Sequence, residues 1–256
     1  MLTKIAWRNV WRNKLRSFTV MGAVVVGVWA LIFLLSFNSG FINAYVESAI
    51  ENELSHLQVH HPDFRDEQEI TYRLDKALEM QATLAAPKAV KAHTTRSISN
   101  GMLATAKGSR GVQIRGIAPS DEAEVTKLDQ KLVDGKYFTD SKKSNPILIS
   151  QRLANKLKLK LKSKVVLTFQ QLDGTLTSAA FKVIGLYETG NAVFEDQMVF
   201  VEQGDLNRLL GASNTVHEVA VKLNDIEQLD TIKRQLAAQF PTTSVETYRE
   251  LSPDDN

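Results

Sequence analysis

The sequence predicts a membrane-anchored α+β protein, and three features indicate this class. Residues Phe18–Phe37 form a run of twenty without a single charge. From His56 onward, apolar residues recur with helix spacing in some segments and strand spacing in others. About two hundred residues follow the apolar run, which is enough for one large or two small domains.

The apolar run is long enough to cross a bilayer. A helix of this length reaches about 30 Å, the thickness of the hydrocarbon core. Twelve of its residues are Leu, Ile, Val or Phe, and each contributes about −0.3 to −0.6 kcal/mol to insertion. A cleaved signal peptide has a shorter apolar region, usually about 7–15 residues, ending in a small-x-small site. Ser36–Gly40 offers no such site, so an uncleaved transmembrane helix at 18–37 is favoured.

The charges that flank the span predict its orientation. Five basic residues precede it, and no acidic residue occurs before Glu47. Because basic residues near a span stay on the cytoplasmic side, we expect a cytoplasmic N-terminus and an exported main domain. The chain has 31 basic and 29 acidic residues, and 26 basic residues remain without those five. The basic excess therefore belongs to the anchor and does not indicate binding of nucleic acid.

Residues 1–17 are predicted to form an amphipathic helix along the cytoplasmic leaflet. Tryptophans prefer the headgroup zone, and arginines near an anionic leaflet contribute about 1 kcal/mol each. The expected membrane-interface residues are Trp7, Arg8, Trp11, Arg12 and Arg16. This segment either only sets the topology, which we favour, or also contacts a cytoplasmic partner.

The helical pattern continues beyond the span through residues 38–55. Apolar residues recur at helical spacing from Phe41 to Ile50, with Glu47 and Glu51 on the other side. A continuous helix from Phe18 to about residue 52 would be roughly 50 Å long. Gly40 is its candidate hinge. Such a stalk would couple movement in the membrane to movement outside it, or would equally serve as a passive spacer.

The exported region shows a similar strand–helix–strand unit at each end. The first has a strand at Leu57–His61, a helix with Ile70, Leu74, Ala77, Leu78 and Leu84 inward, and strands around Val90 and at Gly101–Ile117. The last has a strand at Glu218–Leu223, a helix with Ile226, Leu229, Ile232 and Leu236 on one face, and a strand at Ser244–Tyr248. We expect both units to share one sheet, making a subdomain of residues 56–120 and 212–250 with 251–256 as a tail.

Residues 121–211 are then an inserted subdomain. Its predicted elements are a capping box at Asp121 and Glu124, a strand at Ile147–Ile149, a helix capped by Ser150 and ending at Leu157, a hairpin of Val165–Gln171 and Thr175–Tyr187, a strand at Met198–Val201, and a helix at Leu206–Leu210 closed by Gly211. Asp173-Gly174 is a strong two-residue turn signal for the hairpin.

Signals for catalysis are weak. The chain has no cysteine, which excludes a thiol nucleophile, disulfides and cysteine-ligated zinc. It has no P-loop motif, so it cannot itself be a P-loop ATPase. The cluster of His56, His60, His61, Asp63 and Asp66 matches no standard metal-site spacing, and adjacent strand residues point to opposite faces. We therefore expect no metal, no cofactor and no enzymatic activity.

Five lysines alternate with three leucines between Lys156 and Lys164. In an extended segment they would form a one-sided basic strip facing lipid headgroups or an acidic cargo. The alternative, which we favour, is the end of a helix running into a half-buried strand with a solvated lysine face.

Several segments resemble one known family. Residues 5–17, with the sequence Ile-Ala-Trp-Arg-Asn-Val-Trp-Arg-Asn-Lys-Leu-Arg-Ser, resemble the N-terminus of FtsX-like ABC transporter permeases, the group that includes MacB, LolC and LolE. Further similar segments follow in order at Gly111–Pro119, Leu132–Phe138, Ile147–Ala154, Phe181–Asn191 and Gln203–Leu210. These are turn and packing signatures. Ser150 and Ser163 depart from the family, because glycine is common at both positions.

The resemblance implies a permease subunit in the bacterial inner membrane with its main domain in the periplasm. It implies a Porter-like subdomain of residues 56–120 and 212–250 and a Sabre-like subdomain of residues 121–211. The implied partners are a cytoplasmic ABC ATPase subunit, a second permease copy or paralogue, membrane lipid, and a lipoprotein or periplasmic carrier. Asp173 and Gly174 are the candidate contact with cargo or partner. The family has four spans and this sequence has one, so we expect a fragment or a split permease.

Two other classes of function remain open from the sequence. One is an anchored binding or regulatory module that needs no ATPase, such as an activator of a cell-wall hydrolase. The other is a single-span periplasmic enzyme. Co-purification of a P-loop protein distinguishes the transporter from the first class, and a metal content or hydrolytic turnover would indicate the second.

Substitution of a central residue of the span tests the membrane anchor. We expect Val26→Asp to add about 2.5–3.5 kcal/mol to the free energy of insertion. The variant should therefore shift from the membrane pellet toward the soluble or degraded fraction on fractionation. Unchanged membrane fractionation would count against a span at 18–37.

Overall fold

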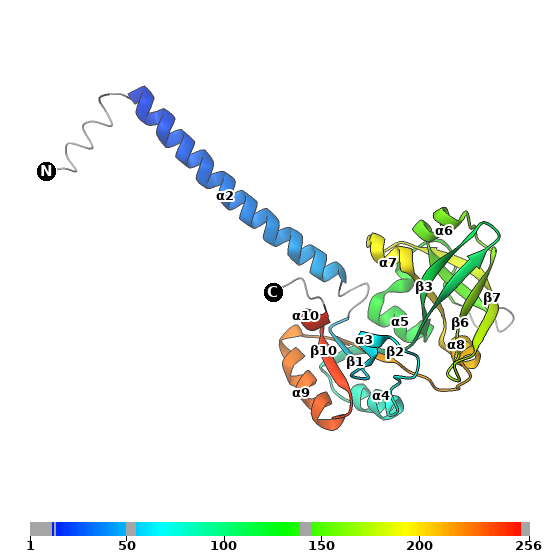
Figure 1. Ribbon diagram of the computed structural model, residues 1–256. Helices are drawn as coiled ribbons and strands as arrows, with labels where there is room; N and C mark the ends of the chain where they lie inside the picture. Colours follow the sequence, from blue (N-terminus) through cyan, green and yellow to red (C-terminus); the bar gives the residue numbers. More distant parts are fainter. Residues whose placement is uncertain (1–11, 13, 50–54, 139–144, 252–256) are drawn as a thin grey trace. The chain divides into compact units, whose positions relative to one another are not determined.

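The computed structural model describes residues 12, 14–49, 55–138 and 145–251, and only the backbone of residues 39 and 41–49 (Figure 1). Two compact units make up the chain, residues 1–48 and 49–256. Trp7, Arg8 and Trp11, the proposed tail 251–256 beyond its first residue, and residues 50–54 of the expected stalk lie outside the described residues.

The described part of the first unit forms one long helix, α2 (Lys14–Ala49), drawn in blue in Figure 1. Its segment Lys14–Asn38 is long and apolar enough to cross a membrane, with a mean hydropathy of 2.5. The large apolar side chains of this segment are exposed, as expected of a helix that lies in lipid. The helix begins four residues before the predicted span and continues through Gly40 without a break.

In the second unit, ten strands form one hydrogen-bonded sheet. They are β1 (Leu57–His60), β2 (Val90–Thr105), β3 (Gly108–Ile117), β4 (Leu132–Gly135), β5 (Pro146–Ser150), β6 (Lys164–Gln170), β7 (Leu176–Tyr187), β8 (Met198–Glu202), β9 (Glu218–Leu223) and β10 (Ser244–Thr247). The path of the sheet runs β10–β1–β9–β2–β3–β8–β5–β7–β4, and β6 pairs with both β2 and β7. The latter pairings close a ring of six strands, β2–β3–β8–β5–β7–β6.

Helices cover the sheet or cap the ring. They are α3 (Phe64–Glu67), α4 (Ala77–Ala85), α5 (Pro119–Thr126), α6 (Gln151–Leu157), α7 (Ala192–Gln197), α8 (Gln203–Leu210), α9 (Leu229–Gln239) and α10 (Tyr248–Leu251), with 3₁₀ segments η2 (Leu128–Lys131) and η3 (Ile226–Gln228). The largest apolar cluster joins inward side chains of the ring to α6 and α8, including Ile114, Leu167 and Leu206. A second cluster lies between the β1–β9–β10 sheet and helices α4 and α9.

Strand β2 belongs to both parts of the exported unit. Its first half, residues 90–96, pairs with β9, and residues 101–104 pair with β6 of the ring. Residues 96–105 pair with β3 on the other edge. Gly101 permits the close approach of β6, because a Cβ at this position would lie 2.6 Å from the Thr168 carbonyl oxygen. The two ends of the exported region meet where β1 pairs with β9 and β10.

Two predicted helix starts were wrong. Ile70 and Leu74 are buried but precede α4, which begins only at Ala77. Their backbones take tertiary hydrogen bonds, from Leu74 N to Val216 O at 2.7 Å and at Ile70 O with His217. Helix α5 begins at Pro119 and not at the predicted Asp121 capping box, because proline suits the first helical position. Its N-cap Ala118 makes no side-chain hydrogen bond.

Two strand predictions also required correction. The segment Gly101–Ile117 is not one strand, because the chain reverses after Thr105 and resumes pairing at Gly108. The hairpin of β6 and β7 is present, but its loop spans residues 171–175 and not two residues. Gln171 N donates to Thr175 O at 2.8 Å and closes this longer loop.

The predicted caps in the inserted segment are confirmed. The hydroxyl of Ser150 accepts a hydrogen bond from Leu153 N at 2.9 Å at the start of α6. Gly211 ends α8 with a φ of +84°, a left-handed conformation that favours glycine. Serine at residue 150 therefore caps a helix at a position where glycine is common in the family.

Candidate functional site

The predicted membrane-interface residues are only partly described. Arg12 and Arg16 lie at the start of the long helix, and both are exposed. Their guanidinium groups would be available to anionic headgroups at the membrane surface. Gly40 is helical, and a Cβ there would meet nothing within 4 Å. Its role as a hinge stays a prediction.

A buried ion cluster joins three elements of the exported unit. Arg96 on β2 is fully buried, and its Nε and Nη2 donate to Glu122 on α5 at 2.9 and 2.6 Å. Its Nη1 donates to Glu218 on β9 at 2.6 Å. Both carboxylates are also buried. The guanidinium of Arg96 on β2 thus links α5 to β9 through hydrogen bonds to one carboxylate on each element.

The electrostatics of this cluster favour the charged forms. Burial opposes the charge on Arg96, but Glu122 and Glu218 outweigh it and raise the pKa of Arg96. Burial also opposes ionisation of Glu218, but the attraction of Arg96, reinforced by Arg115, lowers the pKa of Glu218. Removal of one partner would therefore leave a buried charge without compensation.

Sequence reasoning missed this cluster. The only available signal was an arginine within a strand whose neighbours are hydroxyl residues and Ile98. A charged residue in a buried strand requires partners, but its acidic partners lie 26 and 122 positions away along the chain. Acidic residues at those positions are indistinguishable in sequence from solvated ones.

His217 and His56 form hydrogen bonds with backbone groups of the fold. His217, for which the sequence offers no partner, accepts a hydrogen bond from Ile98 N on Nδ1 at 2.9 Å. Its Nε2 therefore carries the proton and faces Ile70 O at 3.0 Å. His56 Nδ1 likewise accepts from Leu223 N at 2.9 Å. Among the described residues, no group of three or more His, Cys, Asp or Glu residues is placed to hold a metal ion.

The other two members of the predicted histidine cluster diverge from each other. His60 is buried, with Nε2 3.4 Å from Glu246 Oε2. His61 stacks on the ring of Tyr72, with centroids 4.9 Å apart. The structure thus separates these residues into two environments.

The hairpin tip at Asp173 and Gly174 is exposed but tied to its own fold. Asp173 Oδ1 accepts from Thr175 N at 2.9 Å and from its hydroxyl at 2.7 Å. The hydroxyl bond and then the backbone bond lower the pKa of Asp173, so the carboxylate stays ionised at neutral pH. Leu172 N donates to Leu210 O of α8 at 3.1 Å, which holds the loop against the ring. Contact with cargo or a partner at this tip stays a prediction.

The lysine-rich segment follows the end of a helix, as the favoured interpretation predicts. Helix α6 ends at Leu157, and β6 begins at Lys164. The five lysines are exposed, and the intervening leucines are buried or partly buried. Lys156 Nζ also lies 2.6 Å from Asp196 Oδ2. The segment therefore does not form an extended strip.

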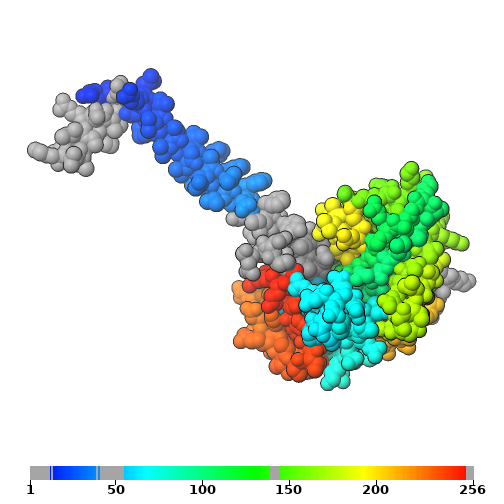
Figure 2. All heavy atoms as spheres, in the orientation of Figure 1, coloured from blue at the N-terminus to red at the C-terminus, as the bar shows by residue number. Residues whose placement is uncertain are grey.

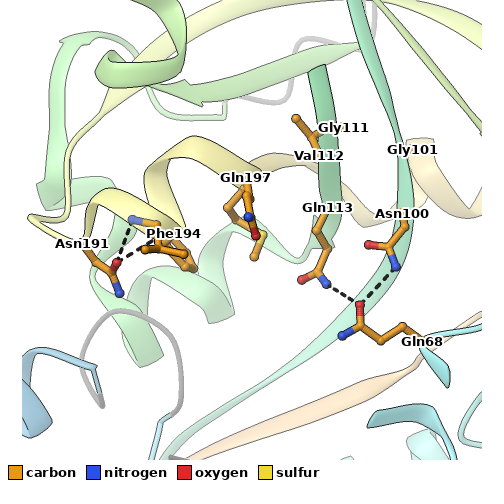
Figure 3. A pocket seen from close by; sticks show the side chains of 11 residues that line it. Gln68, Asn100, Gly101, Gly111, Val112, Gln113, Asn191, Phe194 and Gln197 are labelled. Atoms are coloured by element: carbon orange, nitrogen blue, oxygen red, sulfur yellow. Dashed lines mark hydrogen bonds between the residues drawn. The ribbon is translucent and has the colours of Figure 1, made fainter. Parts of the chain in front are cut away.

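The exported unit has a polar recess, which we call the amide groove. Its volume is about 510 Å³, and five of its lining residues carry carboxamides: Gln68, Asn100, Gln113, Asn191 and Gln197 (Figure 3). The other lining residues in the described part of the chain are glycine or apolar, and none of these is ionisable. In the space-filling view, α7 is the yellow knob beside the green strand surface (Figure 2). The groove lies between β3 and this helix.

An α+β unit behind one helix of membrane-spanning length defines the structural class, and comparison with known families identifies it further. Residues 17–239 match the family described as "MacB-like periplasmic core domain", and the chain belongs to this family. The predicted resemblance to the MacB and LolC group is thereby confirmed. Membership and the apolar helix indicate an inner-membrane protein with a periplasmic domain.

A curated relative matches almost the whole chain. The lipoprotein-releasing system transmembrane protein LolC of Neisseria meningitidis serogroup B is 27% identical over 244 residues. This match covers 91% of the present chain and 56% of LolC, so the chain spans about half the length of that relative.

Two solved structures share the fold. The periplasmic region of MacB from Actinobacillus actinomycetemcomitans superposes with a TM-score of 0.54 at 12% identity, covering 79% of this chain and 93% of that one. The extracellular domain of the noncanonic ABC-type transporter YknZ from Gram-positive bacteria gives 0.50 at 19% identity, covering 75% and 99%. These likenesses confirm the predicted α+β class.

Removal of the central cation tests the ion cluster. We expect Arg96→Met to lower the free energy of unfolding by about 3–5 kcal/mol, because Glu122 and Glu218 remain buried and unpaired. All three tryptophans lie within the first 29 residues, so urea unfolding of the detergent-solubilised chain is best followed by circular dichroism. A triple variant with Glu122→Gln and Glu218→Gln added leaves no unpaired carboxylate in the cluster and should recover part of the loss. If the single variant unfolds no earlier than the triple variant, the charge argument is wrong.

Acid should weaken the fold through His217. Burial is the main cause that lowers the pKa of His217 below its usual value. A histidine that stays neutral in the fold adds stability above its unfolded pKa of about 6.5, and this contribution is lost as the pH falls through that value toward the lower folded pKa. Wild type should therefore lose more thermal stability between pH 7.5 and 5.5, values chosen as roughly one unit either side of that pKa, than His217→Gln does. Equal losses in the two proteins would contradict this assignment.

Proposed function

We propose that this chain is the anchor and periplasmic domain of an ABC transporter permease whose ATP is hydrolysed by a separate cytoplasmic subunit. The main support is the match to LolC, which runs through the apolar helix and the exported unit over 91% of the chain. The family membership covers the same two parts. Whether the permease is a fragment of a larger polypeptide or a split protein does not alter this role.

We infer that the N-terminus lies in the cytoplasm and the α+β unit in the periplasm. The supporting observation is the charge distribution around the span. Arg12, Lys14 and Arg16 lie at its N-terminal end, and the first acidic residue is Glu47. In this orientation Trp7, Arg8 and Trp11 would lie at the cytoplasmic surface beside the ATPase.

Movement is transmitted through α2 to the periplasmic domain. This helix is continuous from Lys14 to Ala49, so at about 1.5 Å per residue it is longer than a bilayer core is thick. Gly40 lies beyond the apolar segment and is the position where bending costs least. The exported unit, with its closed strand ring and buried ion cluster, responds as a stiff body.

The cargo proposed here is a lipoprotein, handed to a periplasmic carrier beside the membrane. A second permease copy or paralogue completes the transporter. The exposed tip at Asp173 and Gly174 is the contact with cargo or carrier. The Porter-like (56–120, 212–250) and Sabre-like (121–211) subdomains are joined through β2 and the ion cluster, so they move together. This cargo is supported by the 27% sequence identity with LolC, which is named as a protein of a lipoprotein-releasing system.

The transporter role is tested by affinity purification of the tagged chain from its native membrane in mild detergent. We expect a P-loop ATPase to co-purify and the complex to hydrolyse ATP. Absence of any ATPase at high recovery of the chain would contradict the transporter role and favour an anchored regulatory module.

The cargo is tested separately by depletion of the chain in living cells. Lipoproteins destined for the outer membrane should then accumulate in the inner-membrane fraction. Unchanged lipoprotein distribution together with a co-purifying ATPase would reject lipoprotein release while retaining the transporter class.

A further inference from the structure

We propose that the amide groove binds an extended, uncharged segment of a partner polypeptide, which adds as a strand to the free edge of β3. This mode of recognition uses backbone hydrogen bonds for affinity and side-chain pockets for selectivity. The groove requires no ATPase, so its test is independent of the transporter role.

Part of one edge of β3 is unpaired, because the neighbouring strand β8 is shorter than β3. β3 pairs with β2 along its whole length, from Gly108 to Ile117. On its other edge it pairs with β8, but only from Gln113 onward, opposite Met198. Residues before Met198 turn into α7 instead of continuing the strand. In the described part of the chain, no strand pairs with residues 108–112 on that edge.

An incoming strand has room at this edge. At about 3.3 Å per residue, the open stretch of β3 would accept roughly five residues of peptide. Gly111 lies within it, is exposed, and would accept a Cβ with nothing within 4 Å. That space lies on a face of the sheet, whereas the approach to the backbone edge is the groove itself, about 510 Å³ in volume, with Gly111 and Val112 on one side and α7 on the other.

The carboxamides of the groove are oriented by a buried arginine. Arg115 is a donor only, and its Nη2 donates to Gln113 Oε1 at 3.3 Å. The Gln113 amide nitrogen therefore donates to Gln68 Oε1, at 3.4 Å, and Asn100 Nδ2 donates to the same oxygen at 3.1 Å (Figure 3). These bonds determine which oxygen and nitrogen atoms of Gln68, Asn100 and Gln113 are already used within the groove.

The remaining carboxamide atoms of the groove could form hydrogen bonds with the backbone of a peptide. The amide nitrogen of Gln68 is a donor for a peptide carbonyl, and Asn100 Oδ1 is an acceptor for a peptide N–H. Asn191 uses its Oδ1 to cap α7, accepting from Val193 N and Phe194 N, so its Nδ2 is a second donor. None of the described lining residues is ionisable, so a charged segment would lose solvation without gaining a partner among them.

The exposed apolar residue of the groove defines the side-chain preference. Val193 on α7 is 68% exposed and lies opposite β3. Small apolar side chains of an added strand would cover it on one face, with polar side chains facing solvent on the other. A partner segment of alternating small apolar and hydroxyl residues therefore fits best. A glycan, even one with an acetamido group on every sugar, lacks a backbone whose N–H and C=O groups repeat at the spacing of a β-strand.

Binding is tested on the full chain in detergent with a short fluorescein-labelled peptide of alternating serine and valine. We expect saturable binding in fluorescence anisotropy. Gly111→Trp should weaken it at least about tenfold, because the indole fills the groove at a position the fold tolerates. Gly204→Trp is the matched control, since a Cβ at Gly204 on α8 also meets nothing within 4 Å. It should bind as wild type does.

Backbone pairing is tested by N-methylation of the peptide, which requires no protein variant. Methyl groups on alternate amides along one edge should abolish binding, whereas methyl groups on the other edge should leave it intact. Absence of saturable binding to wild type, equal binding of both methylated peptides, or displacement by a chito-oligosaccharide would each overturn the proposal. Unchanged binding by a folded Gly111→Trp variant would also overturn it.

Discussion

The hydrogen-bonded pairing of β2 with three different strands is the constraint on which the exported unit depends. Its first half continues the sheet made by the two ends of the exported region, and its second half closes the strand ring. Arg96 pairs with both β9 and β3, and its three hydrogen bonds to two carboxylates tie α5 and β9 to this strand. Apolar burial supplies most of the stability, whereas this junction determines how the two cores are arranged.

Two polar side chains buried near this junction, those of Arg96 and His217, are held by hydrogen bonds within the fold. Arg96 is paired with two buried carboxylates, and His217 is bonded to two backbone groups. Such groups orient other side chains, and Arg115 does so for the amides beside β3. At the amide groove, the described side chains offer a partner hydrogen bonding and shape.

Local patterns predicted most elements but not their long-range arrangement. Ser150 and Gly211 were predictable because a cap depends on residues within one turn. The start of the helix after Ile70 was not, because Leu74 N is bonded to Val216 O far along the chain. The amide groove was equally hidden, since its orientation depends on Arg115 acting through Gln113. Periodicity indicates which face is buried, and not which distant strand covers it.

The shared strand also limits how this architecture can evolve. The segment between α5 and α8 resembles a cassette inserted between two halves of a sheet, yet it supplies only four of the six ring strands. Excision would strip the inner face of the β2–β3 ribbon, leaving Leu103 and Ile114, now wholly buried, in water. Lineages can therefore vary its loops freely, but transplanting the cassette requires that the recipient already carry the complementary ribbon.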